Sequence, residues 1–258
     1  MPYHISYACV SHIGNARSLN QDNFICDGYF MELDDENISF PLTGVTSSKL
    51  PSLFGVFDGL GGEERGEMAA SIAARSAAAV KLGRDAASEL LAFCQKANES
   101  ICHYAEENGI FSMGTTAAML AFTKKEITLC NIGDSKVFRF STGQLEQLSR
   151  DHVDVALFGK KPPLLQNLGI PPEEMVIEPY VARGAYRDGD LYLICSDGLT
   201  DMVDTEEIAQ VLAENELETA VGELLQRALS NGGRDNVSII LCKVQRAPGW
   251  FGKHKLRG

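Results

Sequence analysis

The chain has 258 residues, of which 45% are apolar, and it carries a formal net charge of -12. This length fits one large domain or two small ones, and the apolar content is sufficient for a buried core. No run approaches the roughly 18 apolar residues of a membrane span, and the first residues lack a secretion signal. We therefore expect a cytoplasmic protein with no membrane span. The acidic balance argues against broad nucleic-acid binding, which needs Lys and Arg to neutralise phosphates.

Seven cysteines are spread along the chain without any CxxC pair. Most of them lie inside apolar segments, so we interpret them as reduced thiols that act as small core hydrophobes, and a structural zinc site is not expected. The excess of acid also has a local meaning, because carboxylates gathered at one site repel one another unless protons or cations intervene. A hard divalent cation is therefore a candidate ligand.

The first fifty residues predict two strands and a surface hairpin. Residues 4–11 alternate loosely between apolar and polar side chains, and a second apolar run begins at Phe24. The polar link between these two strands holds Arg17 and Asp22. Residues 31–52 are acidic and rich in turn residues, which favours a long hairpin on the surface.

An apolar run of strand type ends abruptly at Asp58-Gly59, within the stretch LFGVFDGLGGEE. A carboxylate at the buried end of a strand, followed by glycines that let a ligand approach the backbone, suits a metal or a phosphate. Asp-Gly is also a common turn dipeptide, so this stretch alone does not decide between a site and a plain turn.

Two helices follow this stretch. The first is predicted over residues 63–82, which are rich in Ala and begin with two glutamates suited to the positive end of a helix, and Gly83 ends it. The second is predicted over 85–108, where apolar residues recur at i, i+3 and i+4 spacing and form a stripe facing a core.

From residue 114 onwards the pattern changes to short apolar runs separated by turns. The runs TTAAMLAF, ITLCNIG and KVFRF, followed by GQLEQLS, predict adjacent strands of an antiparallel meander. Residues 153–187 have weak periodicity and two proline pairs, which indicates a partly irregular excursion. The pattern is completed by a strand at 191–196, helices at about 205–214 and 216–230, and a strand at 237–244.

Strands and helices come in blocks, and neither a repeat nor a flexible linker divides them. The sequence therefore predicts one α+β domain over residues 1–246, with antiparallel sheets flanked by helices. A basic tail, 247–258, follows the domain. Docking of the tail on a membrane surface or a partner through Trp250 and Phe251 is one interpretation, but an appended segment without chemistry is the simpler one.

Aspartates recur where apolar strands end or begin. Asp58, Asp134 and Asp197 each follow a strand, Asp235 comes just before one, and Asp22 lies between the first two strands. If the sheets bring these ends together, the carboxylates and nearby glycines form a site for Mg²⁺ or Mn²⁺, which prefer oxygen ligands. The alternative is that each aspartate only caps a turn, and the residue pattern alone leaves both interpretations open.

A bare cluster of carboxylates is costly. Two unit charges 4 Å apart repel by about 4 kcal/mol even at an effective dielectric near 20, so three or four of them either protonate or bind cations. Two cations roughly 3.5 to 4 Å apart can share a water, lower its pKa and align it for attack on phosphorus. Arg17 would then supply a planar clamp for phosphate oxygens.

Seven stretches of the chain, taken in order, identify its relatives. They are GNARSLNQDNF, FGVFDGLGG, GTTAAML, NIGDSKVFRF, LSRDH, LYLICSDGL and GGRDNVSIIL. From about residue 5 to residue 244 the chain resembles the metal-dependent protein phosphatases of the PP2C (PPM) family, bacterial type. The fold that this resemblance implies is a four-layer αββα sandwich, with two antiparallel β-sheets flanked by helix pairs, which agrees with the block pattern.

The resemblance implies how this chain would hold two Mn²⁺ or Mg²⁺ ions. Asp58 looks like the residue that bridges the two ions, and the carbonyl of Gly59 would bind one of them. Asp197 and Asp235 fall where the family binds the other ion. Asp22 would lie close to the pair through waters.

Three further residues match family positions. Arg17 matches the phosphate-binding arginine. Asp134 falls where bacterial members contribute to a third, weaker metal site. Asn236, next to Asp235, would orient the neighbouring loop.

The chain also departs from the family pattern. Leu60 stands where many members have a His that is proposed as general acid, and a leucine cannot donate a proton. Gln21 replaces an acid often found before Asp22, and Lys136 replaces the usual Arg after Gly-Asp-Ser. Residues 153–187 occupy the position of the family's flap, although the double prolines are peculiar to this chain.

The resemblance implies hydrolysis of phosphoserine or phosphothreonine in proteins by direct attack of a water that the two ions activate, without a phosphoenzyme. The expected partners are phosphorylated proteins and a cognate Ser/Thr kinase, and we expect a monomer. Leu60 and Gln21 keep a second interpretation open, a catalytically weak phosphoprotein-binding relative that senses or scaffolds. A third is an enzyme acting on small phosphorylated metabolites.

Overall fold

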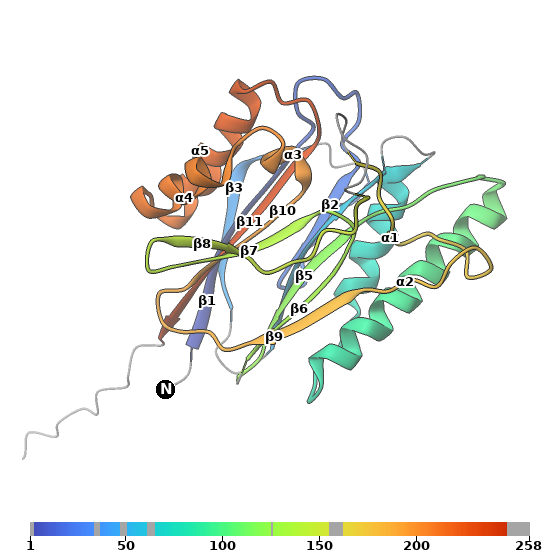
Figure 1. Ribbon diagram of the computed structural model, residues 1–258, viewed down its shortest axis with the longest axis horizontal. Helices are drawn as coiled ribbons and strands as arrows, with labels where there is room; N and C mark the ends of the chain where they lie inside the picture. Colours follow the sequence, from blue (N-terminus) through green and yellow to red (C-terminus); the bar gives the residue numbers. More distant parts are fainter. Residues whose placement is uncertain are drawn as a thin grey trace, which may run out of the picture.

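The computed structural model describes residues 3–33, 37–46, 51–60, 65–124, 126–154 and 162–246. Within them the chain forms two antiparallel β-sheets packed face to face, with helices on both outer faces (Figure 1). The predicted four-layer αββα sandwich of the α+β class is confirmed. The basic tail, 247–258, lies outside the described residues.

The first sheet has six strands in the order β3-β1-β11-β10-β7-β8. Its strands are β1 (Tyr3–His12), β3 (Ile38–Val45), β7 (Lys136–Ser141), β8 (Gln144–Gln147), β10 (Leu191–Cys195) and β11 (Val237–Arg246). The two long strands β1 and β11 pair along their whole length, from Tyr3 opposite Arg246 to His12 opposite Val237.

The second sheet has five strands in the order β2-β4-β5-β6-β9. Its strands are β2 (Asp22–Cys26), β4 (Ser52–Asp58), β5 (Ala117–Phe122), β6 (Ile127–Ile132) and β9 (Tyr180–Gly184). Asp22 is the first residue of β2 and lies directly opposite Asp58, the last residue of β4. Two of the predicted site residues are therefore fixed by strand register.

Large apolar side chains fill the space between the sheets. Phe54 and Phe122 come from the five-stranded sheet, and Tyr192 comes from the six-stranded sheet. The ring centroids of Phe122 and Tyr192 are 5.4 Å apart in an edge-to-face arrangement, which is a favoured geometry for aromatic pairs. This packing holds the two sheets together and so fixes the end at which the aspartates gather.

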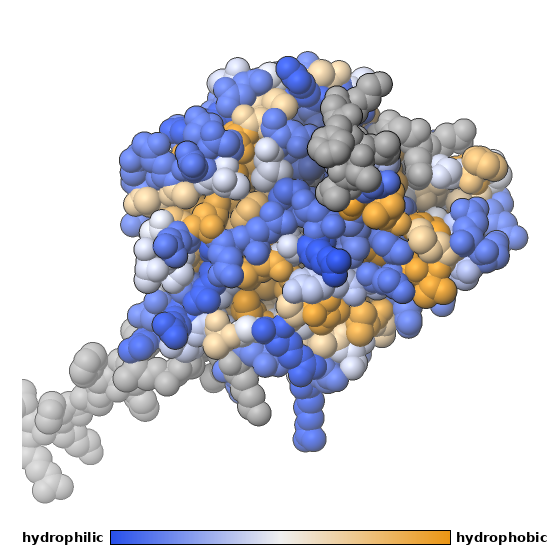
Figure 2. Space-filling view, in the orientation of Figure 1, coloured by the Kyte–Doolittle hydropathy of each residue, from blue (hydrophilic) through white to orange (hydrophobic). Residues whose placement is uncertain are grey.

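Each sheet has its own helical layer and its own core. The five-stranded sheet is covered by α1 (Gly66–Ala78) and α2 (Ala86–Asn108), and the six-stranded sheet by α3 (Asp197–Thr200), α4 (Thr205–Glu214) and α5 (Leu217–Ser230). The helix α2 begins where Asp85 accepts the Ser88 N–H and ends at Gly109 in the left-handed conformation, as helix caps usually do. On the viewed face, hydrophilic side chains lie among smaller apolar patches (Figure 2).

The helix α1 is shorter than predicted. It ends at Ala78 instead of residue 82, and its predicted beginning at Glu63 and Glu64 lies outside the described residues. After the helix, Val80 and Leu82 pack on the core of the five-stranded sheet, and the Gly83 N–H donates to the Glu89 carboxylate at 2.7 Å. The chain therefore leaves α1 before Gly83 is reached, and Gly83 lies in the link to α2.

Two edge strands were absent from the sequence prediction. The strand β3 lies within residues 31–52, which the sequence assigns to a surface hairpin, and it pairs with the outer side of β1. It contains Pro41, which an edge strand tolerates because its missing N–H can face solvent. The strand β9 forms the end of the excursion over 153–187 and pairs with β6.

The predicted meander from residue 114 is wrong in one respect. The strands β5 and β6 pair with each other, and so do β7 and β8, but β6 and β7 belong to different sheets. Gly133, with φ near 100°, and Asp134 lie in this crossing. The short helix α3 was also not predicted.

All seven cysteines are free, and six of them are buried, which confirms the interpretation as reduced core thiols. Within the described ranges, none of the helices combines the length and apolar character required to cross a membrane.

Candidate active site

The fold brings the five predicted aspartates to one end of the sandwich, where Asp22 of β2 lies opposite Asp58 of β4. Asp22 and Asp58 come from the five-stranded sheet, Asp197 and Asp235 adjoin β10 and β11 of the other sheet, and Asp134 lies in the crossing between the sheets. Burial raises the pKa of Asp58 well above its ordinary value, and the charges of the other four aspartates raise it further. The interpretation of these residues as independent turn caps therefore does not describe this end of the molecule.

Asp22 is more deeply buried than Asp58, the acid that lies opposite it in the neighbouring strand. Its side chain is 3% exposed, and burial raises its pKa to about 7, although hydrogen bonds from Ser196 and Ser238 act in the opposite direction. Its Oδ2 accepts the Ser196 hydroxyl at 2.8 Å. Its Oδ1 is buried and has no hydrogen-bond partner among the described residues.

Two threonines hold the backbone of Asp58. The Asp58 carbonyl accepts the Thr116 N–H and the Thr115 hydroxyl, both at 2.9 Å, and the Asp58 N–H donates to the Thr116 hydroxyl at 3.1 Å. These threonines belong to the GTTAAML stretch, but no sequence pattern predicted a role for them. Their buried hydroxyls keep the end of β4 in place.

Gly59 is a position at which the chain itself requires a glycine. A Cβ atom there would lie 2.4 Å from the Gly66 carbonyl oxygen and 2.6 Å from that of Gln21. The Gly59 N–H donates to the Gln21 carbonyl at 3.1 Å. The missing side chain therefore lets three segments of backbone meet beside Asp58.

Arg17 lies next to the acid that the resemblance assigns to a metal. Its Nη2 donates to Asp235 Oδ2 at 2.8 Å, and the two side chains are 38% and 26% exposed. The hydrogen bond to Asp235 raises the pKa of Arg17, although burial acts against it. The guanidinium is thus charged, partly open to solvent and at the edge of the aspartate cluster.

Asn236 fixes the loop that carries Arg17, in agreement with its expected role. Its Oδ1 accepts the Gln21 N–H at 2.8 Å. Its Nδ2 donates to the carbonyls of Ile13 and Leu19, at 2.8 and 3.0 Å. One buried amide therefore ties down both ends of the β1–β2 link.

Lys136 and Gln21, two of the residues that depart from the family pattern, form polar contacts with neighbouring residues. Lys136 Nζ donates to Asp151 Oδ2 at 2.7 Å and to the Asp134 carbonyl at 3.1 Å. Gln21 Nε2 lies 3.5 Å from a carboxylate oxygen of Glu67. Lys136 thus helps to shape the crossing that carries Asp134, and Glu67 brings an acid close to the position where Gln21 lacks one.

The carboxylate oxygens at this site are the type of ligand that hard cations such as Mg²⁺ bind while they keep several of their waters. Among the described residues no group of three or more His, Cys, Asp or Glu side chains is already arranged to hold a metal. Mg²⁺ is usually held by one or two carboxylates together with waters, so a site of this kind does not need three side chains. A cation at this site would give the buried Oδ1 of Asp22 a partner, and its charge would offset the repulsion between the carboxylates around Asp58.

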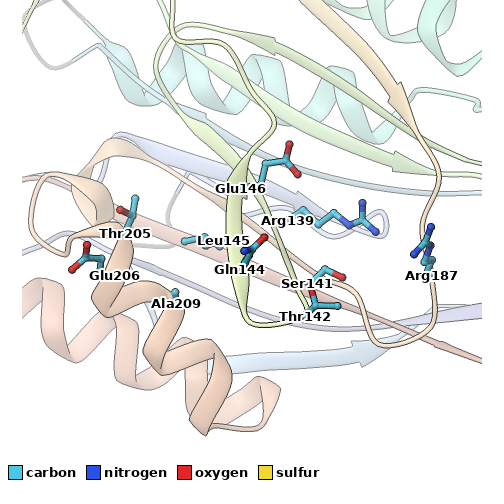
Figure 3. Close-up of a pocket in the computed structure, with 10 residues that line it drawn as sticks. All are labelled: Arg139, Ser141, Thr142, Gln144, Leu145, Glu146, Arg187, Thr205, Glu206 and Ala209. Carbon is cyan, nitrogen blue, oxygen red and sulfur yellow. The ribbon is translucent and has the colours of Figure 1, made fainter.

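A cavity of about 760 Å³ lies away from the aspartates, around the β7–β8 hairpin (Figure 3). Thr205, Glu206 and Ala209 of α4 line one side of the hairpin, and Arg187 lies on the other side. Ser141 at the hairpin is the last residue of β7, whereas Asp134 precedes the first. This cavity is therefore not part of the candidate active site.

The sequence model described as protein phosphatase 2C matches residues 42–232, and the chain belongs to this family. It is 30% identical over 212 residues to the serine/threonine protein phosphatase PstP of Mycobacterium tuberculosis, a match that covers 74% of this chain and 40% of PstP. It is 27% identical over 251 residues to the serine/threonine phosphatase Stp of Listeria monocytogenes, covering 88% of this chain and 91% of Stp. The chain thus spans less than half of PstP but most of Stp.

Solved structures agree with this membership. The catalytic domain of PstP in complex with two manganese ions superposes with a TM-score of 0.77 at 27% identity, covering 95% of this chain and all of that domain. PppA of Pseudomonas aeruginosa, titled a regulatory component of its T6SS, superposes with a TM-score of 0.76 at 25% identity, covering 93% of this chain and 97% of PppA.

Proposed function

We propose that this protein is a metal-dependent protein phosphatase that hydrolyses phosphoserine and phosphothreonine in proteins. The observation that carries the proposal is the convergence of four aspartates, contributed by both sheets and the crossing between them, on Asp58, beside a partly exposed arginine. The named relatives are serine/threonine phosphatases, and the PstP catalytic domain carries two manganese ions. These facts support the same activity for this chain.

Asp58, Gly59, Asp197 and Asp235 would hold two Mn²⁺ or Mg²⁺ ions, with Asp22 close to them and Asp134 at a third, weaker site. Such ions supply an activated water and neutralise charge on phosphoryl oxygens. The role of the chain is to place oxygen donors at one end of a rigid sandwich. The threonine hydrogen bonds to the Asp58 backbone and the strand register of Asp22 serve this purpose.

Arg17 would bind the phosphoryl group of the substrate. Its planar guanidinium can donate two parallel hydrogen bonds to phosphate oxygens. In this structure Asp235 orients one of its nitrogens, and the half-exposed side chain reaches the surface. Asn236 limits the motion of the loop below it.

The expected partners are phosphorylated proteins and a Ser/Thr kinase that modifies them, and the protein would act as a monomer. The name of the relative PstP, a serine/threonine protein phosphatase, supports phosphorylated proteins as the substrates. A folded enzyme that attacks phosphate through water needs no nucleophilic Ser or Cys, so no phosphorylated intermediate is expected to accumulate.

The test is phosphate release from a phosphothreonine peptide, measured with Mn²⁺ and with EDTA and compared with release from sugar phosphates. The proposal predicts Mn²⁺-dependent release with preference for the peptide. Preference for sugar phosphates would point to an enzyme of small metabolites. A folded protein that binds Mn²⁺ and the phosphopeptide without releasing phosphate would be a binding relative instead.

A further inference from the structure

The hydroxyl of Ser196 is used in an unusual way. Ser196 follows β10 and occupies the position before α3, where a serine normally accepts a backbone N–H of the helix. Its side chain makes no such capping hydrogen bond. Instead, the buried hydroxyl donates to Asp22 Oδ2 at 2.8 Å.

Ser196 has a second partner on the neighbouring strand. Its Oγ accepts the Ser238 N–H at 2.9 Å, and the single hydrogen of the hydroxyl is free for another acceptor. An ionised carboxylate only accepts hydrogen bonds, so towards an ionised Asp22 the serine hydroxyl acts as the donor.

This bond crosses from one sheet to the other at the end where the aspartates gather. Ser196 is the neighbour of Asp197 on the six-stranded sheet, and Asp22 faces Asp58 on the five-stranded sheet. The bond holds one carboxylate oxygen of Asp22. The other oxygen, Oδ1, stays buried without a hydrogen-bond partner among the described residues.

We propose that Ser196 is a positioning residue for the cation site, which sets the orientation of the Asp22 carboxylate and its distance from Asp197. The inference rests on the proposed function, because it concerns cation binding by the same aspartates. Groups that orient the ligands of a metal typically change its affinity 10- to 100-fold when they are removed. Loss of the Ser196 hydroxyl should therefore weaken cation binding without removing any ligand.

The test is calorimetric titration of the full chain with Mn²⁺ for the wild type, Ser196→Ala, Ser196→Thr and Ser52→Ala. Ser52 is the matched control, because it is also buried but begins β4, at the opposite end of this strand from Asp58. We expect Ser196→Ala to bind at least one Mn²⁺ about tenfold more weakly. Ser196→Thr keeps the hydroxyl and should stay within about threefold of wild type, as should Ser52→Ala.

Unchanged Mn²⁺ affinity in a folded Ser196→Ala protein would overturn the inference, and so would equal weakening in Ser52→Ala, which would indicate a general effect of the buried serines. If Ser196→Ala does not fold, Ser196→Cys replaces it, since it keeps the volume but offers only a weak donor, with the same expected weakening. A wild type that binds no Mn²⁺ would instead contradict the proposed function itself.

Discussion

Two parts of the candidate site differ in how the charge of their carboxylates is balanced. Asp235 is partly exposed and has the guanidinium of Arg17 at 2.8 Å. Asp22 and Asp58 lie opposite each other in neighbouring strands, and within the described residues neither forms an ion pair. Burial raises the pKa of both Asp22 and Asp58. The chain therefore neutralises one side of its site itself, while the other side depends on protons or added cations.

The largest effect on stability is expected from Asp22→Asn without metal. The folded state raises the pKa of Asp22 from 3.8 to about 7, so ionisation of this carboxyl opposes folding at higher pH. In EDTA at pH 8 the variant should be more stable than wild type, by at most roughly 4 kcal/mol. The advantage should shrink as the pH falls from about 7 towards 3.8, because the wild-type carboxyl then becomes protonated in the folded state.

Urea unfolding of both proteins over this pH range checks the prediction. The variant keeps an oxygen acceptor for Ser196, which makes charge the main difference. A stability difference that grows as the pH falls would contradict the assignment of Asp22 as a buried, unneutralised acid. Saturating Mn²⁺ should favour the wild type, because ligand binding to the folded state alone stabilises it.

Asn236→Ala should destabilise the fold by roughly 3 kcal/mol, because it leaves the three backbone groups bound by this buried amide without their partner. Asn231→Ala is the matched control, since the side chain of this exposed asparagine donates one hydrogen bond, to the Met202 carbonyl. We expect the control to lose less than about 1 kcal/mol. Equal losses in chemical denaturation would show that the β1–β2 link is not held through Asn236.

Arg17→Ala should lower kcat/KM for a phosphopeptide by roughly 10- to 100-fold, the range for losing a charge-assisted hydrogen bond. The same change removes the partner of Asp235, so Mn²⁺ affinity should be equal to wild type or higher. Arg17→Lys should recover only part of the activity, because an ammonium lacks the planar fork. Steady-state kinetics and a Mn²⁺ titration separate the two effects. Weaker Mn²⁺ binding in Arg17→Ala would argue against its place in phosphate binding.

The smallest effect is expected far from the site, at the surface pair of Lys243 and Glu216. Their side chains are 3.1 Å apart and 29% and 87% exposed. Exposed pairs of this kind contribute roughly 0 to 1 kcal/mol. Lys243→Ala should therefore change the unfolding free energy by less than about 0.5 kcal/mol, and a larger change would mean that the stem of Lys243 packs on the sheet.

Local signals predicted the parts of the fold that depend on local structure. The long helix α2 follows from its apolar stripe and from its caps at Asp85 and Gly109. The strand-to-Asp motifs placed Asp58, Asp134 and Asp197 at strand ends, because each motif contains both the strand and its turn. The resemblance then supplied the roles, which composition and periodicity alone left open.

The same local signals did not predict pairing between strands that lie far apart in the sequence. The edge strands β3 and β9 have one neighbour each, so their half-exposed residues resemble loops in the sequence. The crossing at Gly133 passes between sheets, although the strands around it look like one continuous meander. The roles of Ser196 and Thr116 were not predicted either, because their hydrogen-bond partners lie far away in the sequence.

The most direct test of the account compares wild type with Asp58→Asn in Mn²⁺ binding and in phosphate release from a phosphothreonine peptide, with EDTA as the blank. Asp58 is expected to join the two cations, so its neutral analogue should stay folded while Mn²⁺ binding and phosphate release fall to the level of the blank. An Asp58→Asn protein that releases phosphate at the wild-type rate would contradict the central claim that the aspartates at the end of β4 and the start of β2 belong to the catalytic centre.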